Sequence, residues 1–274
     1  MSILHRLQSW LDFSRYSSMG IDRDDDKVII AGMPKSGTTA ISKLLGAATG
    51  MKVFSDPFYQ LDQMGIKFRE EIYSGELSLD SLWNRHQRVF SGEFVKDPNF
   101  PFLLSQIRVL FPNAKIVFIL RDPRDNIRSI LNRLKLPGKI IGSEDLNVIK
   151  NNAAWHNLLT GKSPAVPGSG YIEVLAWRWR KAAEAFLEFK EFGIEIRYED
   201  FNKNKKSEIN KLANKLGYTE LFDINHLVDV QYQPKGDAKV DLDVFFGKPQ
   251  LETIDRITGP ILKEFGYEKH NANS

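Results

Sequence analysis

Near the N-terminus, one lysine and three hydroxyl residues are crowded into a short segment that also holds two glycines. The four side chains are Lys35, Ser36, Thr38 and Thr39. Such side chains supply positive charge and hydrogen-bond donors, which suit a phosphate or sulfate group. Gly32 and Gly37 lie on either side of the lysine, and glycine lets a backbone approach an anion closely. We therefore expect residues 32–37, here called the glycine loop, to bind an anion.

The residues around the glycine loop favour a strand followed by a helix. Residues 27–31 are mostly apolar and β-branched, which is typical of a buried parallel strand. Residues 38–49 carry apolar side chains at helical spacing. A helix N-terminus has a partial positive charge and free N–H groups. Strand, loop and helix together predict a cradle for an anion.

The two glycines have the spacing of a Walker A loop, but the lysine stands elsewhere. That pattern needs a lysine directly after the second glycine, and this chain has Thr38 there, with its lysine displaced to position 35. In nucleoside triphosphatases the lysine at that place reaches the β- and γ-phosphates. The displacement weakens a kinase or nucleotidase interpretation.

Residues 34–39, Pro-Lys-Ser-Gly-Thr-Thr, resemble the 5′-phosphosulfate loop of the sulfotransferases, which use 3′-phosphoadenosine 5′-phosphosulfate (PAPS). The resemblance implies a three-layer α/β fold related to the P-loop nucleoside-triphosphate hydrolases, with a central, mostly parallel sheet flanked by helices. It implies that Lys35 neutralises the leaving phosphate and the bridging oxygen. It also implies a donor-binding set at the 5′ end, formed by Lys35, Ser36, Gly37, Thr38 and Thr39.

A second motif follows the most strand-like segment, residues 114–120, which is apolar except for one lysine. In the sulfotransferases such a strand ends in an arginine, and a serine eight residues later lies in the next helix; both contact the 3′-phosphate. Here these are Arg121 and Ser129. The tyrosylprotein branch adds an arginine at the position of Arg133. Ser129 and Arg133 share a helix face, and the arginine fork matches phosphate oxygens.

Two later segments resemble family motifs as well. Residues 193–201 are expected to form a strand and a turn, and their ending, Arg-Tyr-Glu-Asp-Phe, resembles a family motif in which the tyrosine, here Tyr198, lies near the nucleotide. Lys235 and Gly236 resemble the late Lys-Gly loop that closes over the 3′-phosphate. Pro234 stands where the usual arginine precedes that pair, so Lys239 is an equal candidate.

A general base must accept the proton of the acceptor group. Asp56 ends the expected second strand, and ligands of open α/β sheets collect beyond the carboxyl ends of the strands. The Lys-Asp-Pro sequence that begins at Lys96 resembles the tyrosylprotein branch, which takes a glutamate base from the end of the second strand and implies Lys96 near the sulfonate oxygens. We rank Asp56 first as the base. The alternatives, in order, are Asp97, His86 and His156.

Composition bounds the remaining possibilities. The 274 residues have a net charge of +3 and an isoelectric point near 8.8. This mild excess suits an anionic ligand, but no dense basic stripe indicates nucleic acid. The chain has no cysteine, which excludes disulfides, thiolate nucleophiles and zinc–thiolate sites. We see no set of metal ligands in the sequence, and the mechanism that the resemblance implies requires no metal.

The organisation that we expect is one domain over residues 1–274. Residues 1–20 are expected to hold an amphipathic helix packed on the domain, and residues 1–16 are also compatible with a peripheral membrane contact. No apolar run is long enough to span a membrane, and we expect a cytoplasmic enzyme. Residues 137–142 and 160–170 are rich in glycine, proline, serine and lysine, so residues 137–170 are expected to be a variable region. The resemblance implies that this region shapes the acceptor pocket.

Helical spacing predicts further helices along the rest of the chain. Their expected ranges are 60–73, 78–88, 100–111, 122–136, 144–159, 171–192, 207–217 and 251–265. A further strand is expected over residues 92–98, ending at Pro98.

These motifs predict in-line transfer of a sulfuryl group from PAPS to an acceptor hydroxyl or amine, without a metal. The expected acceptor is a hydroxyl-bearing small molecule or a glycan, although tyrosyl peptide, lipid and phenol stay open. The alternatives are a P-loop kinase or nucleotidase, and a nucleotide-binding protein without catalysis. The sequence does not indicate an oligomeric state.

Overall fold

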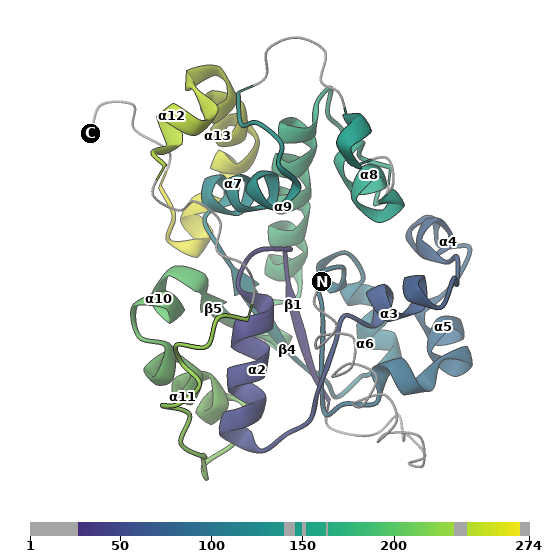
Figure 1. Cartoon of the computed structure of the whole chain (residues 1–274). Helices are drawn as coiled ribbons and strands as arrows, with labels where there is room; N and C mark the ends of the chain where they lie inside the picture. The colour runs from purple at the N-terminus through teal and green to yellow at the C-terminus, as the bar shows by residue number, and fades with distance from the viewer. Residues whose placement is uncertain (1–26, 140–145, 150–151, 163, 233–239, 269–274) are drawn as a thin grey trace.

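The computed structural model describes residues 27–139, 146–149, 152–162, 164–232 and 240–268 (Figure 1). At its centre lies a five-stranded parallel sheet in the order β2-β3-β1-β4-β5. The strands are β1 (Val28–Gly32), β2 (Val53–Ser55), β3 (Phe94–Asp97), β4 (Lys115–Leu120) and β5 (Gly193–Arg197). Since all four pairings are parallel, the carboxyl ends of the strands meet at one edge.

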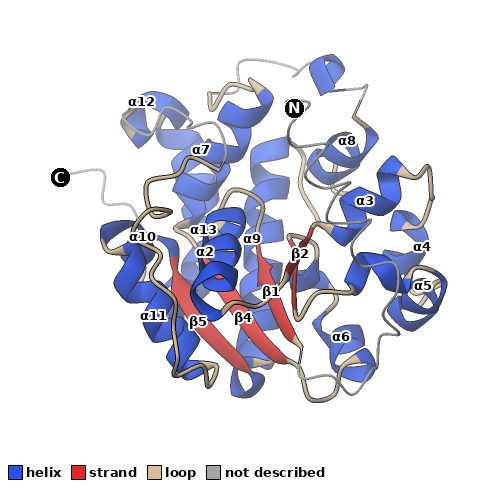
Figure 2. Cartoon of the chain, turned by 60° about the horizontal axis from the view of Figure 1, so that its bottom comes forward, coloured by secondary structure: helices blue, strands red, loops and turns tan. Residues whose placement is uncertain are grey.

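Helices cover both faces of this sheet, as Figure 2 shows. Side chains alternate between the faces along β1, with Val28 and Ile30 in one hydrophobic cluster and Ile29 and Ala31 in the other. On the first face lie α2 (Thr38–Thr49), α10 (Tyr198–Lys203) and α11 (Lys205–Lys215). The opposite face packs against α3 (Pro57–Gln63), α4 (Arg69–Ser74), α5 (Leu79–Arg85), α6 (Leu104–Leu110) and α9 (Tyr171–Glu188). The chain therefore has the three-layer α/β architecture that the sequence indicates.

A third hydrophobic cluster lies beyond the carboxyl ends of the strands and joins helices from distant parts of the chain. Its helices are α7 (Pro123–Leu134), α8 (Ala153–Leu159), the first half of α9, α12 (Leu242–Phe246) and α13 (Lys248–Leu262). Ile127, Ile130 and Leu131 of α7 are wholly buried in it. The cluster fixes α7, which begins two residues after Arg121.

Several expected helices are shorter or broken. The range 60–73 divides into α3 and α4, and Gly65 between them has a φ of +74°, a left-handed value that interrupts a helix. Short 3-10 turns replace parts of the other ranges. These are η1 (Gln87–Phe90), η2 (Phe100–Phe102), η3 (Leu146–Ile149), η4 (Lys190–Phe192) and η5 (Lys263–Phe265).

Two further expectations are corrected. The segment 193–201, expected to be a strand followed by a turn, forms β5 as far as Arg197, and in place of the turn residues 198–203 form α10. Helix α12 was not expected, and the side chain of Asp241 caps it by accepting hydrogen bonds from the N–H groups of Asp243 and Val244. The helix expected over residues 1–20 lies outside the described residues.

Phe118 of β4 lies in the hydrophobic core between the sheet and α9, so its replacement tests this packing. Its ring is 1 % exposed and stacks on Phe186 of α9 at 4.3 Å between centroids. We expect Phe118→Ala to lower the free energy of unfolding by about 3–5 kcal/mol, because truncation leaves a cavity. In Val109→Ala, at a side chain that is 80 % exposed, the change should stay within about 0.5 kcal/mol. Urea unfolding measures both, and equal losses would contradict this packing.

Candidate active site

The glycine loop leaves β1 and enters α2 through two left-handed residues. Lys35 has a φ of +69° and Gly37 a φ of +83°, and the N–H of Ser36 donates to the carbonyl of Met33 at 3.2 Å. A Cβ at position 37 would lie 2.4 Å from the ring of Tyr198. Gly37 is therefore required for two reasons, its backbone conformation and the aromatic ring packed against it.

Arg121, directly after β4, reaches the glycine loop. Its Nη1 donates to the carbonyl oxygen of Lys35 at 2.7 Å, and its guanidinium lies 4.6 Å from the centre of the Tyr198 ring. Trp179 Nε1 donates to the carbonyl of Arg121 at 2.9 Å. The Nε of Arg121 is buried and has no hydrogen-bond partner among the described residues. A buried donor of this kind costs free energy unless an acceptor meets it.

The cations predicted to bind the donor lie close enough to act on one another. Burial, followed by the positive charges of Arg133 and Arg121, lowers the pKa of Lys35. Arg133 is exposed, and Ser129, one turn earlier on α7, is half-buried. A bound anion would relieve the repulsion among the three cations. The structure thus brings Lys35, Arg121 and Arg133 to one place at the carboxyl edge of the sheet.

A second polar group lies on the other side of β1. Lys96 of β3 is 2 % exposed, and its Nζ lies 2.8 Å from Asp56 Oδ1 and 3.4 Å from Thr39 Oγ1. Asp56 itself is a left-handed residue, with a φ of +57°, between β2 and α3. Its side chain is 36 % exposed. The ends of β2 and β3 and the start of α2 therefore meet at one buried ammonium group.

Asp97 is adjacent but faces the protein interior. Its Oδ2 accepts a hydrogen bond from the N–H of Phe58, and its Oδ1 accepts two from Asn99, all between 2.7 and 2.9 Å. Burial, and then the charge of Asp56, raises the pKa of Asp97 to about 6. Both carboxylate oxygens are committed to the turns after β2 and β3, so the geometry gives Asp97 a structural task.

The two histidines considered as alternative bases, His86 and His156, lie in elements that do not carry the other predicted site residues. His86 ends α5 and precedes η1, which leads to the amino end of β3. His156 lies in α8, which packs against η3 and α9. Lys235, Gly236 and Lys239 lie outside the described residues.

Three positions that hold this site together were not assigned to it from the sequence. Asn126 contacts the glycine loop, and Trp179 holds the carbonyl of Arg121. Glu199 accepts hydrogen bonds from the N–H of Asp122 and the hydroxyl of Tyr267. Asn126 alone carried a signal that could have been used, since it lies three and seven residues before Ser129 and Arg133, on the face of α7 that they share.

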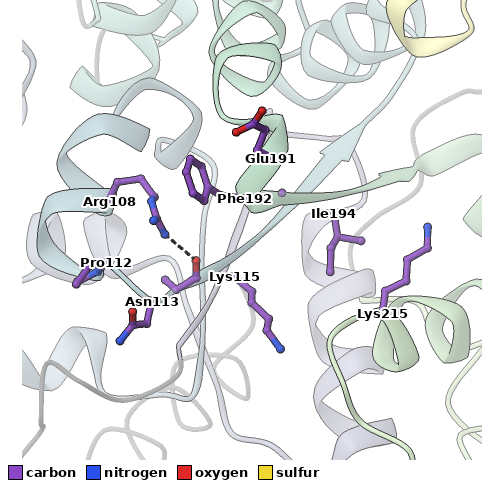
Figure 3. A pocket seen from close by; sticks show the side chains of 10 residues that line it. Arg108, Pro112, Asn113, Lys115, Glu191, Phe192, Ile194 and Lys215 are labelled. Atoms are coloured by element: carbon purple, nitrogen blue, oxygen red, sulfur yellow. Dashed lines mark hydrogen bonds between the residues drawn. The ribbon is translucent and has the colours of Figure 1, made fainter.

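A separate open pocket of about 360 Å³ lies at the opposite edge of the sheet (Figure 3). Its lining comes from the amino ends of β4 and β5 and from the ends of α6 and α11, and includes Arg108, Lys115 and Lys215. Arg108 stacks on Phe192 and donates to the carbonyl of Ala114. None of the predicted site residues lines it.

Among the described residues, no three histidine or acidic side chains gather as a metal site. None of the helices in the described part of the chain is long and apolar enough to cross a membrane.

Comparison with known proteins identifies the family. The family model of the sulfotransferase domain matches residues 25–233. The chain belongs to the sulfotransferase family. No curated protein sequence matches it.

Solved structures support this fold. The sulfotransferase STF9 from Mycobacterium avium is similar with a TM-score of 0.55 and 13% sequence identity, over 97% of this chain and 84% of that one. The sulfotransferase STF1 from Mycobacterium tuberculosis H37Rv is similar with a TM-score of 0.52 and 13% identity, over 93% and 81% of the two chains. The protein is thus a sulfotransferase with the family's α/β fold, and the kinase alternative is not favoured.

The raised pKa of Asp97 in this sulfotransferase predicts how stability changes with pH. Between 3.8, the ordinary value, and about 6, the folded protein holds a proton on Asp97 that the unfolded chain releases. The free energy of unfolding must therefore fall as the pH rises through this window. Asp97→Asn removes the titration, so the stability of wild type relative to this variant should decrease between about pH 4 and pH 7.

Urea unfolding of both proteins across that pH range measures the difference. Asp80→Asn, at the solvated start of α5, serves as the control. A relative stability of wild type that increases with pH would mean that the hydrogen bonds to Asp97 outweigh its burial.

Proposed function

We propose that this sulfotransferase takes its sulfuryl group from PAPS and transfers it to an acceptor hydroxyl. The observation that carries the proposal is the meeting of Lys35, Arg121 and Arg133 around the glycine loop, where burial and then the charges of the two arginines lower the pKa of the lysine. The orphaned Nε of Arg121 adds a buried donor in the same place. A ligand with phosphate groups at both its 5′ and 3′ positions fits such a donor set.

Each residue has a role that follows from its chemistry. Lys35 neutralises the charge that develops on the leaving phosphate and its bridging oxygen, and the glycine loop with Ser36, Gly37, Thr38 and Thr39 holds the 5′-phosphate. Arg121, Ser129 and Arg133 bind the 3′-phosphate, and Tyr198 packs near the nucleotide. Bound PAPS supplies the activated sulfuryl group. Lys96, buried beside Thr39, lies within reach of the sulfonate oxygens.

Asp56 is the residue that we propose as the general base. Its carboxylate is held by Lys96 at 2.8 Å yet is 36 % exposed, so an acceptor can approach it from outside. The base takes the proton of the acceptor hydroxyl as the oxygen attacks sulfur. The protein otherwise contributes mostly positioning and charge stabilisation, as in phosphoryl transfer.

The acceptor that we propose is a hydroxyl-bearing small molecule or a glycan. The segments around residues 60–88 and 137–170 shape the pocket that binds it. Within these segments, Asn157 of α8 donates to Glu70 of α4 at 3.5 Å, which joins the two regions beside the site. The contact supports a shared acceptor-binding surface formed by α4 and α8.

Magnesium-dependent phosphoryl transfer is a weaker candidate because its residues are otherwise engaged. Asp122, the acidic residue best placed to hold Mg²⁺, accepts hydrogen bonds from the N–H, Nε and Nη2 of Arg124. It caps the N-terminus of α7. The lysine that would reach a γ-phosphate is replaced by Thr38.

Titration calorimetry with 3′-phosphoadenosine 5′-phosphate (PAP), 5′-AMP and magnesium-ATP tests the donor. Wild type should prefer PAP to 5′-AMP by at least about tenfold, because charge-assisted hydrogen bonds to a phosphate are strong. Arg121→Ala should abolish that preference, and Arg88→Ala, at an exposed arginine of η1, should keep it. Indifference to the 3′-phosphate, together with a preference for magnesium-ATP, would overturn the proposed donor.

Replacement of Asp56 tests the base. Asp56→Asn should lower sulfuryl transfer by about 10²- to 10⁴-fold, the usual contribution of general base catalysis, and PAP should still bind. Transfer from labelled PAPS to a panel of 4-nitrophenol, a hexose, a sterol and a tyrosyl peptide gives the readout. The control is Asp229→Asn, whose side chain is 97% exposed. Near-normal turnover in Asp56→Asn would remove Asp56 from this role.

A further inference from the structure

Asn126 is a fully buried polar residue in the helix that carries Ser129 and Arg133. Its side chain is 0 % exposed, and its Oδ1 has no hydrogen-bond partner among the described residues. The hydrogen bonds of its Nδ2 must therefore offset the lost hydration of the amide. Nδ2 donates to the carbonyl oxygen of Pro34 at 2.8 Å and to Ser36 Oγ at 2.9 Å. Both partners belong to the glycine loop, so Asn126 joins that loop to α7.

This contact and one from Arg121 act on the two peptide groups that flank Lys35. Asn126 holds the carbonyl of the peptide before Lys35, and Arg121 Nη1 holds the carbonyl of the peptide after it. A peptide group is planar, so anchoring both planes fixes the φ and ψ angles between them. The φ of Lys35 is +69°, a left-handed value that costs a residue with a Cβ about 1–2 kcal/mol.

The anchored planes also set where donors point. In a trans peptide the N–H and C=O directions are opposite. With the Pro34 carbonyl directed at Asn126, the N–H of Lys35 points away from α7. The amide of Asn126 cannot be reversed without setting Oδ1 against the Pro34 oxygen, so the Nδ2 donor keeps this orientation.

We propose that Asn126 is a positioning residue, which holds Lys35 in its left-handed conformation and thereby aims its ammonium group at the 5′-phosphate of the donor. Asn126 acts through the loop and does not touch the ligand. It lies three and seven residues before Ser129 and Arg133, on the same face of α7. One helix thus positions the groups for both ends of the nucleotide. The inference rests on the proposed binding of the 5′-phosphate by Lys35.

Two nucleotides separate this role from a general effect on folding. PAP carries both phosphates, and adenosine 3′-phosphate lacks the 5′-phosphate, so the ratio of their dissociation constants reports the contribution of that group. Asn126→Ala should reduce the ratio by about tenfold, because the hydrogen bond from the Lys35 ammonium group to the charged 5′-phosphate would be lost. Adenosine 3′-phosphate should bind as before. Asn132→Ala, the same change at a half-buried position of α7, should leave the ratio unchanged.

A double-mutant cycle with Lys35→Ala then tests whether Asn126 acts through the lysine. In the Lys35→Ala background, Asn126→Ala should change the ratio no further. An equal additional loss in that background, or a loss of affinity for both nucleotides alike, would overturn the inference. If Asn126→Ala does not fold, Asn126→Leu, which keeps the branch at Cγ and removes the donor, is carried through the same cycle.

The outcome for Lys35→Ala alone keeps the two proposals apart. A normal ratio in that variant would mean that Lys35 does not bind the 5′-phosphate, and the proposed function would fail first. A reduced ratio in Lys35→Ala with an additive effect of Asn126→Ala would leave the function standing and reject the positioning role.

Discussion

The site depends on a lysine held in a backbone conformation that lysine seldom adopts. Lys35 keeps its left-handed φ because carbonyls on both sides of it accept hydrogen bonds from Asn126 and Arg121. Those two residues come from the segment that follows β4, some ninety positions along the chain. The parallel register of β1 and β4, in which Gly32 pairs with Ile119, brings this segment beside the glycine loop. The sheet thus fixes the conformation of the glycine loop.

Charge is concentrated at this edge of the sheet at a cost to stability. Lys96 and Asp97 are buried at the end of β3, and Lys35 lies among arginines at the end of β1. Hydrophobic clusters on both faces of the sheet and beyond its carboxyl end hold these groups in place. Proteins accept such local strain chiefly where a ligand relieves it. Under the proposed function, a polyanionic donor would relieve the repulsion among Lys35, Arg121 and Arg133.

Much of this arrangement could be predicted from local sequence pattern. Helix α2 has the same bounds as its expected range, and the strand ends that carry Asp56, Lys96 and Arg121 follow from apolar runs and their stop signals. The remainder depends on contacts between distant residues. The role of Asn126 requires positions 126 and 34 to meet, and the interior direction of Asp97 requires the N–H of Phe58. The helix that begins at Tyr198 likewise is not encoded by periodicity. The break at Gly65 is local instead, because a left-handed glycine interrupts the helix there.

The position of β1 at the centre of the sheet explains how one loop can serve two chemical tasks. On the β4 side lie Arg121 and Asn126, which donate hydrogen bonds to the glycine loop. On the β3 side lies Lys96, which contacts Thr39 at the start of α2 and is paired with Asp56. Under the proposed function, the nucleotide therefore extends over β4 and α7, and the sulfuryl group faces β3. The acceptor must then approach from the β2 edge, where α3 and α4 lie. Because these helices are short and separated by the turn at Gly65, acceptor specificity can change there without disturbing the donor side.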